Sequence, residues 1–588
     1  MALIAQHTQR VRQALARPAR IGVELFVLLL VAAFVALVVA VGRQVRSPLH
    51  ERVAIDLSFR ALPGYTLLSL GRGFLAYVLA LVFTLVYGTI AAHNRRAEKL
   101  MLPALDVLQA IPVLGFLPGL VLAMIALFPT REIGLELACV VMIFTAQAWN
   151  MTFSFHGSLR GIPTSAREVA AVNRLGAWQT FRLLEVPAAM IGLVWNSMMS
   201  MAGGWFFLTV NEAFTLGNHD YRLPGIGSYM NEAINRGDVP AMLAAVVAMV
   251  VMIVTVDRVL WRPIVVWSQK YKIEDTPEAD APRSLVLELL QRSRLRRWLV
   301  RRLALRRTNA ARRSVAVPAA ASSARDRGRV LVAAGRALRW LVIAALAAGG
   351  VAGTATLVRL LAALPLAGAG NGHDWAHVVL ALLASFARTT AAVAIAAAWA
   401  LPAGIWIGRS PKWSRRLQPL VQVAASFPAP MLFPLVTLLL LALHVPFTLG
   451  CVALMLLGAQ WYVLFNVIAG AVAIPADLKE VATANGMPRR QRWSRLYVPC
   501  VFPYLVTGLV TAAGGAWNAT IVSEYVNFKD RTFSAFGLGS TISHATAEGD
   551  FPLLCAAIVT MAVFVVLVNR LFWRRMYRLA EERYSLNA

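Results

Sequence analysis

Long apolar runs recur along this chain, and short polar segments separate them. A bilayer crossing takes roughly 20 apolar residues, and backbone groups in lipid must bond to one another, which favours helices. In the first half we predict spans near 21–42, 66–92, 104–128, 133–156, 187–212 and 240–260. In the second half we predict spans near 340–361, 377–407, 419–442, 447–470, 499–525 and 551–569. The pattern therefore predicts an all-α polytopic membrane protein with about twelve spans.

The two halves repeat one unit. An offset of 312 residues places polar and aromatic landmarks of one half on those of the other, such as Glu168 on Glu480 and Trp205 on Trp517. Upstream of the fourth span the offset becomes 316, which places Arg72 on Arg388. Internal repeats of this kind define the architecture. We expect two six-helix units of the same orientation, residues 1–262 and 340–588, joined by a basic linker at 263–339.

Composition and charge agree with a membrane protein. Of the 588 residues 59% are hydrophobic and only 15% are charged, and the mean hydropathy is +0.64. The formal charge of +28 is concentrated in the linker and in short loops between spans. Basic residues collect on the cytoplasmic side and attract anionic lipid, so we expect both termini in the cytoplasm and no nucleic-acid partner. The apolar run after Arg20 is typical of a signal anchor rather than of a cleaved signal peptide.

The chain shows no pattern of a catalytic site. There is no GxxxxGK[ST] loop for a nucleotide phosphate, and no GxSxG, HExxH or CxxC. Cys139, Cys451, Cys500 and Cys555 are scattered, so we expect them to be packing residues. His373 and His377 have the spacing of a helical metal pair, but an interfacial helix start anchored by Trp375 is the stronger interpretation. We therefore expect no metal site and no enzyme.

Two related segments, 158–186 and 470–498, follow the fourth span of each half; we call them the first and second twin loops. Each begins after Ile-Pro, which suits helix initiation, continues with a short Glu-Val-Ala helix, and ends at Val-Pro. Small alanines allow another surface to approach closely, and the glutamate offers a charge to a basic partner. One such loop could simply rest on lipid headgroups. Two in register indicate a paired docking device.

The twin loops resemble the coupling loops of binding-protein-dependent ABC importer permeases. In the second loop the family's Glu-Ala-Ala, three residues and Gly pattern matches Glu480, Ala482 and Gly486, and in the first it matches Glu168, Ala170 and Ala171. The first loop has Arg174 where glycine is expected and Gly176 two residues later, which leaves the geometry of its turn open and indicates that the two halves dock unequally. The resemblance implies that these residues couple the chain to an ATPase.

Further motifs resemble the nitrate, sulfonate and taurine branch of that family. They are a Ser-x-x-Arg entry to the second span, at 69–72 and 385–388, and a Gly-Trp…Glu…Gly-x-Gly signature, at 203–227 and 514–539. The resemblance implies a duplicated inner-membrane permease of bacteria that imports a small anion or organic acid of the nitrate, sulfonate/taurine or bicarbonate class. It implies two copies of a cytoplasmic P-loop ATPase, which would bind ATP and Mg²⁺, and a solute-binding protein. It implies no cofactor on this chain.

Polar and aromatic residues in the spans are candidates for a translocation path or gate. Ionisable groups in spans are costly and usually face a cavity or a partner. The alternative is that the two glutamates pair with the arginines of span two and fix helix packing, and that the tryptophans are core residues. The candidates are Arg72, Trp205, Asn211, Glu212, Arg388, Trp517, Asn518 and Glu524.

Two other classes of protein remain open. A self-contained secondary transporter with two six-helix halves would need ionisable pairs deep in several spans to carry a coupling ion, and it would leave the twin loops unexplained. A membrane-anchored scaffold that uses the basic linker would leave the duplicated spans without a purpose. The ABC importer permease accounts for both features.

Overall fold

A computed structural model describes residues 53–110, 113–130, 132–216, 219–271, 284–292, 348–367, 373–528 and 531–584, and a few isolated residues besides. The chain divides into two compact units. One comprises residues 1–36 and 278–363, and its described part contains helix α12 (Leu285–Arg292) and the apolar helix Ala348–Ala363. The other comprises residues 37–277 and 364–588, so spans two to six of both halves lie together in it.

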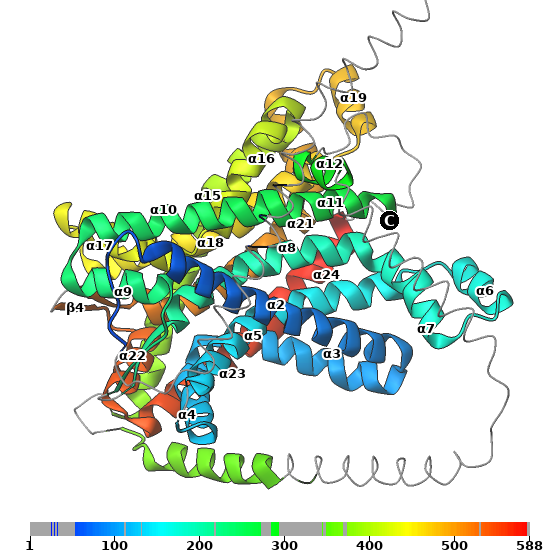
Figure 1. Cartoon of the computed structure of the whole chain (residues 1–588). Coiled ribbons are helices and arrows are strands. Elements are labelled where there is room, and N and C mark those ends of the chain that lie inside the picture. The colour runs from blue at the N-terminus through cyan, green and yellow to red at the C-terminus, as the bar shows by residue number, and fades with distance from the viewer. Residues whose placement is uncertain are drawn as a thin grey trace, which may run out of the picture. The chain divides into compact units, whose positions relative to one another are not determined.

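Within the larger unit the two halves have the same order of elements (Figure 1). The first contains α2 (Leu62–His93), α3 (Arg95–Ala110), η1 (Val113–Phe116), α4 (Leu117–Leu127), α5 (Ile133–Arg160), α6 (Thr164–Val172), α7 (Ala177–Thr180), η2 (Phe181–Glu185), α8 (Val186–Asn211), β1 (Ala213–Leu216), β2 (His219–Arg222), α9 (Ile226–Arg236), α10 (Val239–Val256), η3 (Asp257–Trp261), α11 (Arg262–Ser268) and η4 (Gln269–Tyr271).

The second half repeats this order. It contains α15 (Trp375–Arg409), α16 (Pro411–Ser426), η5 (Ala429–Met431), α17 (Phe433–Ala442), α18 (Phe447–Val472), α19 (Ala476–Ala484), α20 (Arg489–Arg492), η6 (Trp493–Tyr497), α21 (Val498–Ser523), β3 (Tyr525–Phe528), β4 (Arg531–Ser534), α22 (Leu538–Glu548), α23 (Phe551–Val568), η7 (Asn569–Trp573) and α24 (Arg574–Tyr584).

Eight helices in the described part of the chain are long and apolar enough to cross a membrane. They coincide with the second, fourth, fifth and sixth spans predicted for each half; the expected span 133–156, for example, is α5 (Ile133–Arg160). The all-α polytopic fold class is thereby confirmed. The first predicted span of the chain, 21–42, lies almost entirely outside the described residues, and that at 340–361 is described from residue 348 onward.

The third span of each half is not the single helix that we predicted. The expected span 104–128 is divided between the end of α3, the 3₁₀ turn η1 and the 11-residue α4, and the expected span 419–442 is divided between α16, η5 and the 10-residue α17. In the second half the break falls at Phe427, which is extended (φ −75°, ψ 130°) and precedes Pro428. A residue before proline is disfavoured in the α conformation, so the helix ends there.

A short hairpin follows the fifth span of each half, where we predicted no strands. Strand β1 pairs antiparallel with β2, and β3 pairs with β4 in the same register, Ala213 opposite Arg222 and Tyr525 opposite Ser534. The hairpins mark one end of the bundle, which we call the hairpin end. The twin loops lie at the other end of α8 and α21, which we call the loop end.

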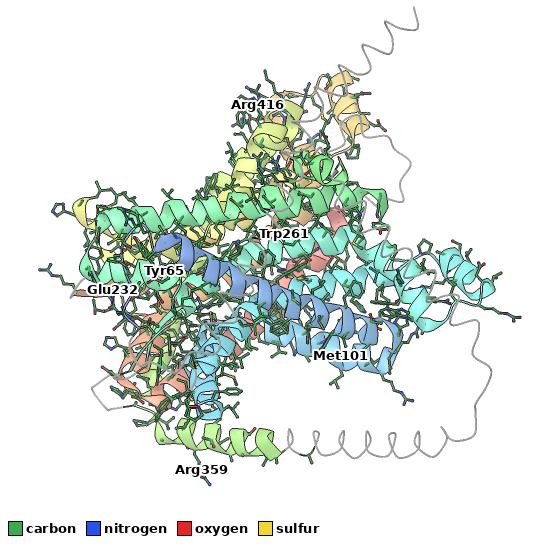
Figure 2. The ribbon with its side chains drawn as sticks, in the orientation of Figure 1. Tyr65, Met101, Glu232, Trp261, Arg359 and Arg416 are labelled. Atoms are coloured by element: carbon green, nitrogen blue, oxygen red, sulfur yellow. The ribbon has the colours of Figure 1, made fainter. Side chains whose placement is uncertain are left out.

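Close helix packing builds the core of each half. Helices α2, α5 and α8 pack on one another in the first half, as do α15, α18 and α21 in the second. In the first half Trp261, labelled in Figure 2, is buried and meets the ring of Tyr77 edge-on at 5.6 Å, which joins the sixth span to the second. The halves contact each other through their broken third spans, because η1 packs on α21 and η5 packs on α8.

Candidate functional site

The twin loops have the same backbone. In the first, α6 is followed by a tight turn, the short helix α7 and the π-helical turn η2, which runs directly into α8. In the second, α19, α20 and η6 follow the same plan into α21. Each Ile-Pro stands just before the helix start, with Pro163 and Pro475 as N-cap residues.

The turn after each short helix is left-handed. Arg174 has φ 52° and Gly486, its counterpart, has φ 60°. The amide of Arg174 donates to Ala171 O (2.9 Å) and that of Leu175 to Ala170 O (3.1 Å), and the second loop repeats both bonds at equivalent positions. This is the Schellman pattern of a helix end. Arg174 therefore forms the first turn at the position where the family has glycine, and Gly176 instead caps the next helix, α7.

The short helices bury one alanine and expose their remaining face. Ala170 and Ala482 are buried against their own half, so the small side chain allows the helix to approach the bundle rather than a partner. Glu168, Glu480 and Ala171 are exposed. The exposed face also carries three mostly exposed valines, Val169, Val172 and Val481, at 62%, 82% and 56%.

The first twin loop is tied to the bundle by charged side chains. Arg167 donates to Leu159 O at 2.7 Å. At the end of α5, Arg160 forms an ion pair with Glu98 of α3, and His156 lies 3.2 Å from the same carboxylate. The hydrogen bond from Arg160 lowers the pKa of Glu98 below its usual range. The loop is thus held by fixed contacts at its base while its outer face remains open.

A buried cluster of charges joins spans two, four and five at the hairpin end of the first half. Arg72 donates to Glu212 Oε1 (2.6 Å) and, in bidentate fashion, to Glu136 (2.7 Å twice). Ser69 also donates to Glu212 (2.6 Å). The side chains of Arg72, Glu136 and Glu212 are 2%, 7% and 0% exposed. The alternative in which Glu212 pairs with Arg72 is therefore what the structure contains.

The second half repeats this cluster with one fewer carboxylate. Arg388 donates to Glu524 (2.7 Å), and Ser385 bonds the same carboxylate at 2.8 Å. Position 448, the counterpart of Glu136, is a threonine. The free arm of Arg388 donates instead to Phe536 O (2.6 Å), and the Arg388 side chain is 13% exposed.

The glycines of the two Gly-x-Gly motifs lie directly against these carboxylates. The amides of Gly227 and Gly539 donate to Glu212 Oε2 (2.7 Å) and Glu524 Oε2 (2.9 Å). A Cβ at Gly225 would lie 2.3 Å from the Glu212 carboxyl, and one at Gly537 would lie 2.4 Å from Glu524. No side chain fits at these positions, so the motif encodes a close approach.

Sequence reasoning missed Glu136 as the third member of the first cluster. Its signal was available, since an ionisable residue in the first turn of a span requires a partner. Comparison of the two halves did not reveal Glu136, because the second half has a threonine at the equivalent position, 448.

The remaining path candidates divide into packing residues and polar groups. Trp205 and Trp517 are buried, and the Trp205 ring lies against Gly73 of α2. Asn518 accepts a hydrogen bond from the Val113 amide of the other half (2.9 Å). Asn211 is buried, and neither polar atom of its amide has a hydrogen-bond partner among the described residues. Asn518 therefore contacts the other half, whereas Asn211 lines a small cavity within its own half, beside Leu117 and Tyr221.

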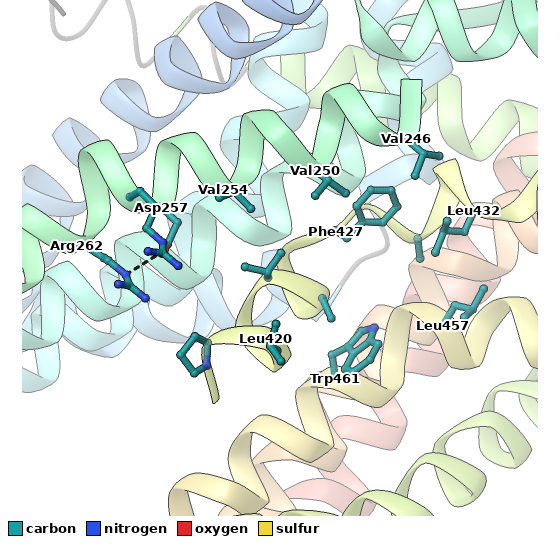
Figure 3. A pocket seen from close by; sticks show the side chains of 15 residues that line it. Val246, Val250, Val254, Asp257, Arg262, Leu420, Phe427, Leu432, Leu457 and Trp461 are labelled. Carbon is teal, nitrogen blue, oxygen red and sulfur yellow. Dashed lines mark ion pairs between the residues drawn. The ribbon is translucent and has the colours of Figure 1, made fainter. Parts of the chain in front are cut away.

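A groove of about 570 Å³ lies where α10 of the first half faces α16, η5 and α18 of the second. Figure 3 shows Val246, Val250 and Val254 of α10 opposite Leu457 and Trp461 of the other half. At the loop end the groove is lined by the ion pair Arg262–Asp257 (3.5 Å), drawn as a dashed line in Figure 3. Because both halves line this seam groove, its width depends on how they sit against each other.

The histidines of the sequence HDWAH take separate partners. His373 Nδ1 lies 2.7 Å from Asp550 Oδ2, whereas the ring of His377 meets Phe536 edge-on at 5.2 Å. The preceding residue of the helix, Asp374, caps α15 by accepting from the His377 amide. Among the described residues no group of three or more metal-ligating side chains converges. The helix-start interpretation agrees with this geometry.

Comparison with known protein families finds the same domain once in each half of the chain. Residues 84–260 and 400–585, together more than half of the chain, each match the family model described as "binding-protein-dependent transport system inner membrane component". The chain is 26% identical over 188 residues to a bicarbonate transport system permease protein of Synechococcus elongatus, which covers 32% of this chain and 64% of that relative.

Other relatives have different names. The chain is 26% identical over 202 residues to a nitrate import permease protein of Leptolyngbya laminosa (34% of this chain, 68% of that relative). It is 26% identical over 220 residues to a glycine betaine/proline betaine transport system permease protein of Escherichia coli (37% and 56%). The match to the bicarbonate relative spans less than two thirds of that protein's length.

Proposed function

Since this chain belongs to the family of binding-protein-dependent transport system inner membrane components, with two family domains in tandem, we propose that it forms the whole membrane path of an ABC importer. A single such chain supplies both halves of the path and docks two cytoplasmic ATPase subunits, one on each twin loop. The observation that carries the proposal is the pair of loops with one backbone, each with an open glutamate and valine face.

The face of each loop suits a docked protein better than water. Val172 is 82% exposed and Val169 is 62% exposed on a helix of only nine residues. Burial of apolar surface contributes about 25 cal/mol per Å², so a partner groove that covers these valines gains free energy. The neighbouring glutamate selects a groove with a basic rim. ATP and Mg²⁺ would be bound by that partner.

The substrate proposed is a small anion or a related organic acid. Support comes from the names of two relatives, which act on bicarbonate and on nitrate, and from the signature motifs of that branch. We place the path between α8 and α21, where η1 and η5 cross from the opposite half. The neutral amide of Asn518, which bonds the Val113 amide of the other half, suits an anion there better than a carboxylate does. A solute-binding protein would deliver the anion at the hairpin end.

In this proposal the buried clusters are fixed supports rather than gates. Arg72 and Glu212 are fully paired and enclosed, and so are Arg388 and Glu524 except for one edge of the guanidinium. Each cluster ties spans two and five to the helix after the hairpin. ATP-driven closure of the partners would then move the halves as rigid bodies and change the width of the seam groove.

Purification of the tagged full-length chain from its native membrane tests the docking. We expect a P-loop ATPase at two copies per chain, reduced to one copy by Glu168→Arg or Glu480→Arg alone and lost in the double variant. Glu548→Arg, an exposed glutamate in α22 at the hairpin end, is the matched control and should change nothing. A chain that comes alone in mild detergent, and transports in liposomes under an ion gradient without ATP, would refute the importer.

A further inference from the structure

The second half carries a basic and aromatic groove at its loop end, of about 950 Å³. It lies between the end of α15 and the helix α20 of the second twin loop. Its lining contains four arginines and no acidic residue: Trp406, Arg409, Met487, Arg489, Arg490, Gln491, Arg492, Trp493, Ser494 and Tyr497. Within the described part of the chain, the salt bridges found include none to these arginines. The described residues therefore place a concentrated positive charge in this groove and pair it with no carboxylate.

Two of the arginines are held in place by the groove itself. The guanidinium of Arg409 lies over the ring of Tyr497, 4.9 Å from its centroid. Arg492 donates its Nε–H to Met487 O at 2.7 Å. Arg489 and Arg490 are exposed at the mouth. Fixed guanidinium groups give up little rotamer freedom when they bind an oxyanion.

The level of the groove relative to the membrane identifies its ligand class. Arg409 is the last residue of the spanning helix α15. One turn earlier, Trp406 is 51% exposed, and its ring lies 5.3 Å from that of Trp413. Exposed tryptophans at the end of a span lie at headgroup depth, and basic pockets at this level bind anionic lipid headgroups.

The first half provides a natural comparison, because the same backbone there lacks the charge. The counterparts of Arg489, Arg490 and Arg492 are Ala177, Trp178 and Thr180. The counterparts of Arg409 and Tyr497 are His93 and Glu185, which form their own pair at 2.9 Å. In the first half the carboxylate of Glu185 therefore pairs with the basic side chain at the end of span two, whereas Tyr497 stands at that position in the second half.

We propose that this groove binds the phosphate headgroup of an anionic phospholipid. The phosphate would lie between Arg409 and the arginines of α20, with Trp406 and Trp493 against the glycerol and upper acyl chain. The lipid would tie the second twin loop, and not the first, to the plane of the membrane. This binding does not depend on the transported substrate or on an ATPase.

The test is a titration of the full-length chain, in phosphatidylcholine nanodiscs, with dioctanoyl phosphatidylglycerol, followed by tryptophan fluorescence and by native mass spectrometry. The double variant Arg489→Gln/Arg490→Gln changes two exposed side chains. Each arginine near an anionic surface contributes roughly fivefold, so we expect about 25-fold weaker binding. The matched control is Arg95→Gln/Arg96→Gln, an exposed pair at the corresponding end of the first half, which should bind as the unchanged chain does.

Three results would overturn the assignment. Equal weakening by the control pair would show general attraction to the basic surface. Displacement of the lipid by equimolar inorganic phosphate would assign the groove to a free anion. Unchanged lipid binding together with loss of a co-purifying ATPase would assign the arginines to a protein interface.

Discussion

Removal of the arginine from each buried cluster should destabilise the two halves unequally. Arg72→Ala leaves two enclosed carboxylates, Glu136 and Glu212, whereas Arg388→Ala leaves only Glu524. The two substitutions remove the same side chain from equivalent places, so the loss of packing is nearly common to both. The difference between them isolates the second carboxylate.

The magnitude follows from the cost of an uncompensated buried charge. Loss of one partner of a buried ion pair costs about 3–5 kcal/mol. For Arg388→Ala we expect the lower end of that range, because Ser385 and the amide of Gly539 still bond the Glu524 carboxylate. For Arg72→Ala the cost should be about twice as large, since two carboxylates less than a tenth exposed then face each other without a cation.

Thermal unfolding of the purified full-length chain in one detergent measures the two shifts. The decisive variant is Arg72→Ala combined with Glu136→Thr, which reproduces the composition of the second cluster. It should recover stability to the level of Arg388→Ala, while Glu136→Thr alone should cost about 1–3 kcal/mol for its lost hydrogen bonds. Equal shifts for the two arginine variants, or no recovery in the double variant, would refute the reasoning.

Three further predictions concern the motif glycines, the loop turn and the pH response. Gly225→Ala should destabilise strongly, because its Cβ would lie 2.3 Å from a carboxyl group, whereas Gly203→Ala, with nothing within 4 Å, should not; unfolding midpoints compare them. Arg174→Gly should stabilise the first twin loop by about 1 kcal/mol, and Gly486→Ala should destabilise the second by a similar amount. The rate of proteolysis within each loop measures these changes, and effects of the opposite sign would contradict the prediction. Burial would raise the pKa of Glu232, but the hydrogen bonds from two arginines outweigh it and hold that pKa below its usual range. A carboxylate whose pKa is lowered by folding stabilises the protein at pH values above its unfolded pKa of about 4.3, and this stabilisation is lost as the pH falls through the folded pKa. The thermal unfolding midpoint should therefore fall less steeply with decreasing pH in this range for Glu232→Gln than for the unchanged chain.

The long spans could be predicted from the sequence because one physical rule governs them. A run of about 20 apolar residues has few alternatives in a bilayer, and α5, α8 and α10 begin within one residue of the expected positions. The pairing of the arginines of span two with the glutamates after span five was also predictable, since enclosed charges of opposite sign seek each other.

What could not be predicted depends on geometry that apolar patterns do not encode. The run around Pro428 is as apolar as the other spans, and only the backbone restriction before proline divides it. The hairpins have strands of four residues, too short for an alternating pattern to stand out. Asn211 gives no sign in the sequence that its buried amide lacks partners. These features depend on which helices meet, which a single sequence does not show.

The turns at Arg174 and Gly486 have the same backbone conformation although their residues differ. A left-handed backbone costs a non-glycine residue roughly 1–2 kcal/mol, yet Arg174 adopts it with the same two hydrogen bonds as Gly486. The first loop also has the bond from Arg167 to Leu159 O and the Glu98–Arg160 pair at its base. The second half has a serine and a valine, at 414 and 472, in place of that pair. Each half therefore reaches one loop geometry by a different route, which is expected if both loops must fit the same partner.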